Sequence, residues 1–280
     1  MVSTFSQAVQ VAALTLRRHG VPSPVRDARL LLARAARLDL VGLTLRSDEE
    51  IAAKVSQRFD DMIALRCKRV PSSQILGQRE FYGRSFRITQ QVLDPRPETE
   101  CLVAAALRKP FNRVLDLGVG SGAIIISLLK ENLSATGLGV DQSDCACQQA
   151  RENAIIHDVE NRVELLKSNW FSKVMGRFDL IVANPPYIAA DELANLCDEV
   201  RLHEPIDALT DGGDGLSAYR EICHDARKHL LNDGRLIFEI DPKRRTQVEK
   251  ILHGFGFEDR EICPDLAGQE RIIVTKAGNM

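Results

Sequence analysis

The sequence predicts an α/β protein in which a helical bundle precedes a doubly wound, mostly parallel β-sheet. Two patterns predict this fold. The first third of the 280-residue chain places apolar residues at helical spacing. From Arg113 onward, short apolar runs alternate with helical stretches, which is typical of parallel strands covered by helices on both faces. A chain of this length also favours two domains over one.

We therefore expect a helical domain at residues 1–78, a connecting hairpin at 79–93 and a sheet domain at 94–280. The hairpin would run from Phe81 to Ile88 with Gly83 in its turn.

Three helices are expected in the first domain. Phe5–Leu16 and Ala28–Leu38 have helical patterns. Ser47–Glu50 has a hydroxyl three residues before a carboxylate, which is the pattern of a capping box. This pattern predicts that the third helix begins at that point, carries Ile63 on its apolar face and ends before Pro71.

The second domain alternates strands with helices. The expected strands are Val114–Leu117, Thr136–Val140, Val163–Leu166, Leu180–Ala183 and Leu236–Ile240. The helices between them are expected at Ala123–Lys130, Ser143–His157 and Leu216–Leu230. Phe257–Cys263 and Arg271–Thr275 would form an antiparallel hairpin at the edge of the sheet.

The composition argues against a membrane, disulfide-bonded or metal protein. No apolar run approaches the roughly 20 residues that a membrane span needs, and the N-terminus lacks the pattern of a signal peptide. The seven cysteines form neither a disulfide framework nor the paired clusters that bind zinc. We expect a cytoplasmic protein without a metal.

The net charge of −2 hides an asymmetry between the two ends of the chain. Residues 1–92 carry a net charge of +7 and the remainder carries −9. Such a distribution fits an acidic partner or docking between the two parts, and it also fits a solvated arginine-rich surface.

A glycine-rich segment is expected where the first strand of the sheet turns into its helix. Gly118, Val119, Gly120, Ser121 and Gly122 follow Asp116-Leu117. Glycines let the backbone pass close to a ligand, and the start of a helix offers free N–H groups. Asp141, which ends the second strand, suits a ribose diol. These features indicate a nucleotide cofactor, and the spacing also fits a dinucleotide.

The third strand ends in Ser168-Asn169-Trp170. The polar side chain of Asn169 can hydrogen-bond an adenine amino group. Trp170, the only tryptophan in the chain, would pack nearby or in the core.

Asn184-Pro185-Pro186-Tyr187 follows the fourth strand. Consecutive prolines end the strand abruptly at the edge where open α/β sheets bind ligands. The Asn184 side-chain oxygen and a rigidly held proline carbonyl are acceptors, which suit the two hydrogens of an NH2 group. Tyr187 can close over the plane of that group.

The motifs together resemble the release factor glutamine methyltransferases, the PrmC/HemK family. The resemblance extends over nearly the whole chain. Beyond the motifs above, it rests on Val92–Glu100, Glu204–Leu209, Gly212–Leu216 and Asp265–Arg271.

The resemblance implies a class I methyltransferase, Rossmann-like in fold, that uses S-adenosyl-L-methionine. Its substrate would be the glutamine in the Gly-Gly-Gln loop of peptide-chain release factors, held with help from the N-terminal domain. Neither a membrane nor direct nucleic-acid binding is expected. The implied cofactor contacts are Gly118 to Gly122, Asp141, Asn169, Trp170 and Asn184, and the substrate glutamine would meet Asn184, Pro185, Pro186 and Tyr187.

Three positions depart from the family pattern. Asn169 stands where Asp is usual, Asp94 replaces an apolar residue, and Asp241 lies where Glu-x-Gly is usual. The alternatives are an adenine-amino methyltransferase acting on RNA or DNA, a nicotinamide-dependent oxidoreductase and a non-catalytic binding module. The acidic second part of the chain argues against the first, and no hydride-transfer site supports the second.

Overall fold

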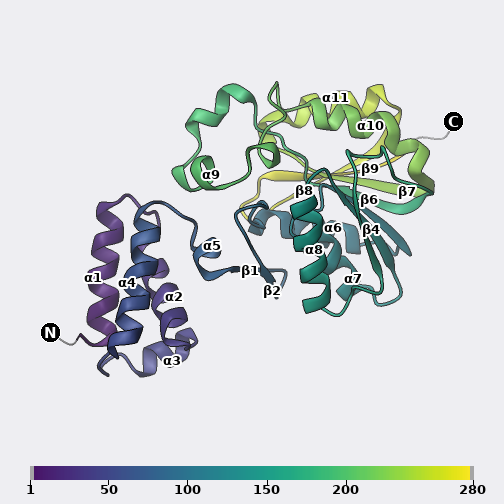
Figure 1. The fold of residues 1–280 in the computed structure, drawn as a ribbon. Coiled ribbons are helices and arrows are strands. Elements are labelled where there is room, and N and C mark those ends of the chain that lie inside the picture. The colour runs from purple at the N-terminus through teal and green to yellow at the C-terminus, as the bar shows by residue number, and fades with distance from the viewer. Residues whose placement is uncertain (1–2, 278–280) are drawn as a thin grey trace. The chain divides into compact units, whose positions relative to one another are not determined.

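The computed structural model describes residues 3–277, which form two compact units (Figure 1). The first unit runs to Gln78 and includes Cys197–His203. The second begins at Arg79 and contains the remainder of the chain.

The first unit is a helical bundle. Its helices are α1 (Phe5–Arg18), α2 (Pro24–Ala36), α3 (Leu40–Leu45), α4 (Ala53–Cys67), α5 (Ser72–Leu76) and, from later in the chain, α9 (Asp198–His203). Thr4 caps α1 in a capping box with Gln7, and Pro24 occupies the first turn of α2. Leu16, Leu31 and Leu32 are fully buried in the core between the helices. The first two predicted helices are confirmed, and each predicted C-terminal end lies within two residues of the observed one.

The predicted capping box at Ser47–Glu50 is wrong. Helix α4 begins at Ala53, after Ala52, which makes no side-chain cap. The backbone of Ser47–Glu50 pairs instead with the start of α1, because the Ser47 and Glu49 carbonyls accept from Ser6 N (2.9 Å) and Phe5 N (3.1 Å). These long-range bonds override the local capping preference, although Ile63 lies in the core as predicted.

The segment Cys197–His203 is held to the bundle by a buried ion network. Arg66 is 4% exposed and donates from Nε to Asp27 Oδ2 (2.7 Å) and from Nη2 to Glu199 Oε1 (2.8 Å). Arg69 also pairs with Glu199. A buried guanidinium needs such partners, and Asp27 alone leaves part of Arg66 unpaired. Glu199 lies within the domain predicted at residues 94–280.

The predicted hairpin is formed by β1 (Gln78–Phe81), which begins at the last residue of the first unit, and by β2 (Arg84–Arg87) of the second unit. Tyr82 and Gly83 both have positive φ, as a tight two-residue turn requires. Phe81 and Phe86 are buried in the core of this unit. The hairpin expected as a connection therefore forms part of the core.

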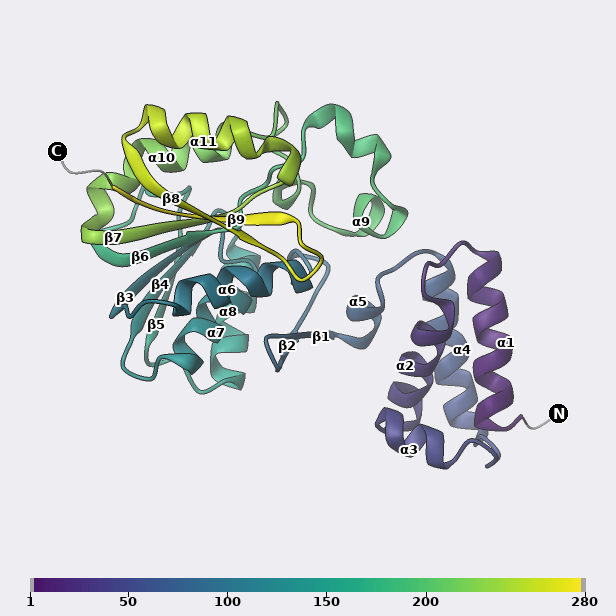
Figure 2. The ribbon, with the colours of Figure 1, turned by 180° about the vertical axis from the view of Figure 1, so that it is seen from behind.

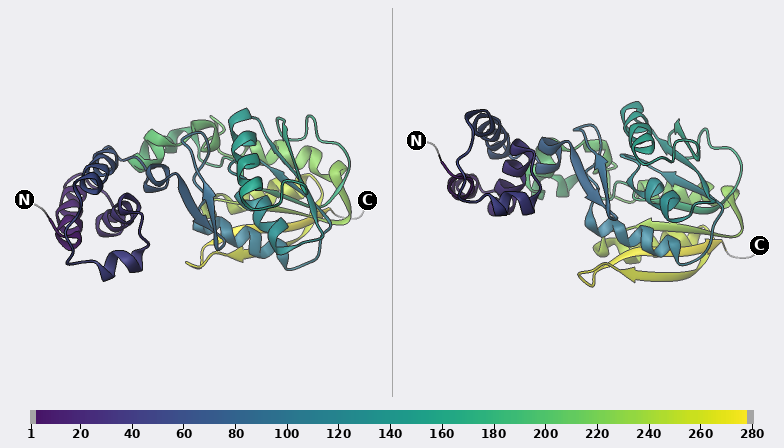
Figure 3. Two further views of the ribbon diagram at one scale, coloured as in Figure 1. Left: turned by 60° about the horizontal axis from the view of Figure 1, so that its bottom comes forward. Right: turned by 90° about the horizontal axis from the view of Figure 1, so that it is seen from below.

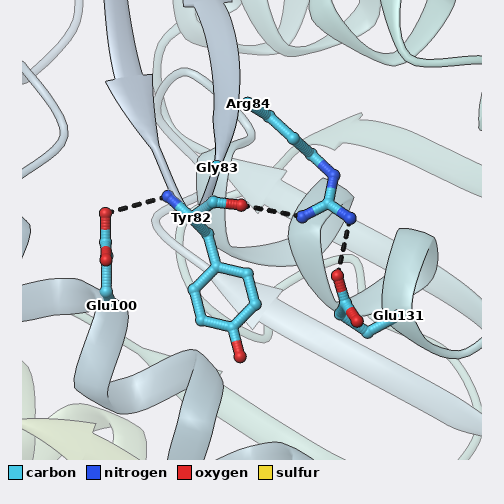
Figure 4. Close-up of a pocket in the computed structure, with 5 residues that line it drawn as sticks. All are labelled: Tyr82, Gly83, Arg84, Glu100 and Glu131. Carbon is cyan, nitrogen blue, oxygen red and sulfur yellow. Dashed lines mark hydrogen bonds and ion pairs between the residues drawn. The ribbon is translucent and has the colours of Figure 1, made fainter.

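The turn of this hairpin borders a cavity of about 420 Å³ (Figure 4). Glu100 accepts from Tyr82 N at 2.9 Å, and Arg84 pairs with Glu131 at 2.6 Å. These polar groups bond to one another and attach the hairpin to the helices that carry Glu100 and Glu131. We therefore interpret the cavity as a structural contact rather than a ligand site.

The second unit is built around a seven-stranded sheet with the order β5-β4-β3-β6-β7-β9-β8. The strands are β3 (Arg113–Leu117), β4 (Thr136–Asp141), β5 (Val163–Lys167), β6 (Phe178–Ala183), β7 (Leu230–Glu239), β8 (Phe257–Pro264) and β9 (Glu270–Ala277). Strand β9 runs in the direction opposite to the other six strands. The five predicted strands and the antiparallel hairpin at the sheet edge are confirmed, and that hairpin is yellow in Figure 3.

Helices cover both faces of the sheet, as predicted (Figures 1 and 2). The helices of one face are α6 (Glu100–Leu107), α7 (Ala123–Glu131) and α8 (Asp144–Ile156), and those of the other are α10 (Ser217–His229) and α11 (Arg245–Gly254). Short 3-10 turns complete the unit, namely η1 (Pro97–Thr99), η2 (Ala190–Asn195), η3 (Ile206–Ala208) and η4 (Pro242–Arg244). Within residues 3–277, no helix is both long and apolar enough to cross a bilayer.

Candidate active site

The candidate site lies where the winding direction of the sheet reverses. From β3 the chain proceeds through β4 to β5 on one side, and β6 and β7 follow on the other. Such a switch point, at the carboxyl ends of the strands, is where open α/β sheets bind ligands. A cavity of about 530 Å³ lies there, within the range of ligand sites of about 300–1,000 Å³.

Most of the predicted site residues line this cavity. They are Gly118, Gly120, Asp141, Asn169, Trp170, Asn184 and Pro186. Val119, Ser121, Gly122, Pro185 and Tyr187 lie beside them in the chain but outside the lining. The lining also includes residues that the sequence analysis missed, namely Gln91, Val92, Leu93, Gln142, Ser143, Ala146, Ser168, Pro205, Asp207 and Ala208.

The glycine loop is anchored to the neighbouring strand. The amides of Gly118 and Val119 both donate to Val140 O at 2.9 Å. Gly122 has a positive φ, and a Cβ there would lie 2.8 Å from the Ile126 side chain and 3.1 Å from that of Ala150. Gly122 is therefore required for the packing of α7 against α8.

Asp141 ends β4 and lines the cavity. Its Oδ2 accepts from Gly120 N at 3.0 Å, and its Oδ1 accepts from Ser143 N at 2.9 Å. Burial raises the pKa of this carboxyl, while the same backbone hydrogen bonds lower it. Each oxygen keeps a second lone pair, so the carboxylate fits the two hydroxyls of a ribose.

Asp116, which begins the glycine motif, is fully buried. Its Oδ2 accepts from Ile125 N at 3.2 Å, whereas its Oδ1 has no partner among residues 3–277. Burial, with a smaller contribution from the charge of Asp141, raises the pKa of Asp116 to about 8. The sequence pattern of the strand does not predict that the pKa of this carboxyl is shifted.

Trp170 follows β5 with a positive φ of 42°. Ser168 stabilises this turn, because its hydroxyl donates to Trp170 O (2.9 Å) and accepts from Lys173 N (3.1 Å). The tryptophan lines the cavity and also packs against the core of one sheet face. Asn169 beside it is exposed.

The Asn184-Pro185-Pro186-Tyr187 segment leaves β6 at the cavity wall. Asn184 Nδ2 donates to Thr99 Oγ1 at 3.3 Å. Tyr187 packs against the core rather than lining the cavity, and burial raises its pKa, so that it stays a neutral phenol.

The Gly212–Leu216 motif supports this segment from behind. A Cβ on Gly215 would lie 2.3 Å from Tyr187 O. Asp211 holds the loop by accepting from Gly213 N (2.8 Å), Gly215 N (3.0 Å) and Ser217 N (2.9 Å). Burial favours a higher pKa for Asp211, but the bonds from Ser217 and the backbone lower it to about 2.

Two further motifs meet at an ion pair. Arg96, from the Val92–Glu100 segment, donates through Nη2 to both carboxylate oxygens of Glu204 at 2.7 Å. Glu204 is buried and directly precedes Pro205 of the cavity lining. This pair fixes one wall of the cavity, a role that spacing alone could not predict.

Two departures from the family pattern have structural explanations. The buried carboxylate of Asp94 lies 3.7 Å from Arg79 Nη1, which compensates its charge. Asp241 caps η4 by accepting from Lys243 N at 3.0 Å and pairs with Arg244 at 2.7 Å. Nothing in the structure explains Asn169.

Comparison with known proteins gives a consistent result. Residues 92–216 match the "Methyltransferase small domain" model, and residues 7–77 match the "PrmC N-terminal domain" model. A release factor glutamine methyltransferase of Cereibacter sphaeroides is 45% identical over 268 residues, covering 96% of each chain. Another from Agrobacterium fabrum is 39% identical over 279 residues, covering 97% of this chain and 96% of its own.

Solved structures share the fold at low sequence identity. A Pyrococcus furiosus methyltransferase has a TM-score of 0.55 at 16% identity, with 71% of this chain and 91% of that chain covered. The hMettl16 catalytic domain in complex with an RNA hairpin has a TM-score of 0.57 at 17% identity, with 78% and 82% covered. At these identities the likeness shows the fold alone.

Proposed function

We propose which residues of the cavity bind the cofactor and which bind the substrate, starting from the fact that the chain belongs to the family of release factor glutamine methyltransferases. It is an S-adenosylmethionine-dependent enzyme that methylates a glutamine side chain of release factors. One observation carries the proposal: a single cavity has Asp141 and Gly118 in the same lining as Asn184 and Pro186. Such a cavity can hold a methyl donor and an acceptor nitrogen together.

In this proposal the cofactor lies among the glycine loop, Asp141, Asn169 and Trp170. Asp141 accepts from the ribose hydroxyls with the lone pairs that Gly120 and Ser143 leave free. The volume and the acceptors of the lining fit S-adenosylmethionine, which supplies an electrophilic methyl group.

The Asn184 end of the cavity receives the substrate nitrogen. An amide nitrogen is a poor nucleophile because its lone pair is delocalised. The Asn184 oxygen and the Pro185 carbonyl would accept its two N–H bonds and so stabilise the positive charge that develops during attack. Holding the nitrogen in line with the methyl group would raise the rate of the transfer further. We assign no general base, because the proton can leave after the transfer.

The substrate in this proposal is the glutamine of the Gly-Gly-Gln loop of a release factor. Two glycines without side chains let the main chain come close to the cavity mouth. The helical unit would help to hold the rest of the factor, and the enzyme would act in the cytoplasm, where translation ends.

The test is to incubate the enzyme with labelled cofactor, a release factor and total RNA, and to locate the methyl group by mass spectrometry. We expect methylglutamine in the release factor and no label in a variant whose loop glutamine is alanine. Methyladenine in RNA, with an unmodified release factor, would establish the adenine alternative instead.

A further inference from the structure

A chain of buried polar groups leads from the cavity into the protein. Asn184 lines the cavity and donates from Nδ2 to Thr99 Oγ1 at 3.3 Å. Thr99 is 4% exposed, and its hydroxyl also hydrogen-bonds Glu239, a carboxyl at the end of β7 that is 1% exposed. The other carboxyl oxygen of Glu239, Oε2, has no partner in the described part of the chain.

The donors and acceptors of this chain fix its direction. An ionised carboxylate only accepts, so the single hydrogen of the Thr99 hydroxyl must point to Glu239. Thr99 Oγ1 can then only accept from Asn184. The side-chain amide of Asn184 must therefore turn its NH2 group to Thr99, which leaves Oδ1 for a ligand in the cavity.

We propose that Glu239 and Thr99 are positioning residues that orient the Asn184 amide so that its oxygen meets the substrate nitrogen. The proposal rests on the proposed function, in which the substrate presents an NH2 group. The reversed amide would place NH2 against NH2 and offer no acceptor. Orientation before the substrate arrives is what gives such contacts their effect on the transition state.

The direction of the chain depends on the charge of Glu239. Burial raises its pKa to about 7, whereas the bond from Thr99 and the charge of Arg271 lower it. A protonated Glu239 can itself donate to Thr99, and the hydroxyl hydrogen is then free to turn to Asn184. The other charged or titratable groups near Glu239 are Glu98, Arg96, Cys101, Tyr187 and Tyr219.

The experiment compares Thr99→Val with Thr99→Ser in the full-length enzyme with a release factor as substrate. Valine matches the shape of threonine without the hydroxyl, and serine keeps the hydroxyl. We expect kcat to fall about tenfold in Thr99→Val, the worth of one hydrogen bond. The Kd for S-adenosylmethionine should stay within about twofold, and Thr99→Ser should restore kcat.

The pH profile gives a second, independent measurement. The wild-type kcat should decline as the pH falls below about 7. In Glu239→Gln, which cannot titrate and whose amide can also donate to Thr99, kcat should be low already at pH 8, as in the protonated wild type, and the acid decline should be absent. This variant keeps the test decisive if Thr99→Val does not fold.

Equal kcat values for wild type and Thr99→Val, or an unchanged acid decline in Glu239→Gln, would overturn the inference. Failure of the proposed function is distinguishable, because it appears as a wild-type product other than methylglutamine. The comparison of Thr99→Val with Thr99→Ser decides the inference on any substrate that presents an NH2 group.

Discussion

At the scale of single residues, Asp141 has two tasks. Each of its carboxylate oxygens already accepts one backbone amide, from Gly120 or Ser143. The side chain therefore shapes the glycine loop and also offers its remaining lone pairs to a ligand.

We predict that Asp141→Ala weakens the binding of S-adenosylmethionine by roughly 1.5–3 kcal/mol, the worth of a hydrogen bond to a charged group. Isothermal titration calorimetry measures this change. The matched control is Asp144→Ala, since Asp144 lies nearby but is exposed and forms an ion pair with Lys167. Unchanged affinity in a folded Asp141→Ala protein would contradict the assignment.

Asp116 makes the stability of the fold depend on pH. Its folded pKa of about 8 lies above its ordinary value of 3.8, so its contribution to stability is complete below about pH 4 and is lost as the pH rises to about 8. We expect its share of the free energy of unfolding to fall by about 1.4 kcal/mol per pH unit within that window.

Urea unfolding of the wild type and Asp116→Asn between pH 5 and pH 7 tests this prediction. Asparagine cannot ionise, so the fall in stability with pH should be smaller in the variant. Glu239, whose pKa is also raised by burial, contributes equally to both proteins and does not affect the comparison. Identical pH slopes would show that Asp116 is already ionised in the folded protein.

At the scale of elements, the Asn184–Tyr187 segment depends on the loop behind it. Gly215 and Gly212 both have positive φ. A Cβ on Gly215 would lie 2.3 Å from Tyr187 O, whereas a Cβ on Gly212 has no neighbour within 4 Å.

We predict that Gly215→Ala lowers kcat on a release factor by about 10²-fold, because the Tyr187 carbonyl must move and misplace Asn184 by a fraction of an ångström or more. Gly212→Ala carries only the strain of the left-handed conformation, about 1–2 kcal/mol of stability. Steady-state kinetics and thermal melts of both variants separate the effects. Equal activity in the two would mean that this loop does not position Asn184.

The same scale shows how far the sequence could predict this molecule. The strands of the sheet and the line of Gly118, Asp141 and Asn184 at its edge follow from local periodicity and from the rule that parallel strands share an edge. The start of α4 could not be predicted, because backbone pairing of Ser47 with the start of α1 decides it. Non-local contacts of this kind leave no periodic pattern.

The buried polar contacts were equally hidden. Thr99 and Glu239 are about 140 positions apart in the sequence, and only the fold brings them together. The Val92–Glu100 motif contains Thr99, but the resemblance did not single this residue out or indicate a contact with Asn184. The ion pair between Arg96 and Glu204 likewise joins residues that are far apart in the sequence.

At the scale of the whole molecule, the two compact units do not follow the sequence as simple halves. The chain leaves the second unit after Leu196, contributes Cys197–His203 to the first, and returns at Glu204. Glu199 is held there by Arg66 and Arg69, so this short segment belongs to the helical bundle. The basic charge of that bundle suits an acidic surface on a protein substrate.

We predict that a shortened protein beginning at Arg79 keeps cofactor binding but loses its advantage with whole release factors. Arg79 is a better start than Pro95, because a start at Pro95 would remove Phe81 and Phe86 from the core. The full-length enzyme should favour a whole factor over a short Gly-Gly-Gln peptide by at least about tenfold in kcat/KM, since a larger interface adds binding energy.

The peptide serves as the internal control for folding. If the helical unit acts in docking, the shortened protein should methylate the peptide about as well as the full-length enzyme does, because the cavity lies within the second unit. It should then treat peptide and whole factor alike. A shortened protein that still prefers the whole factor would show that the second unit alone recognises the substrate. Loss of activity on the peptide as well, with cofactor affinity intact, would show that the helical unit is needed for the methyl transfer itself.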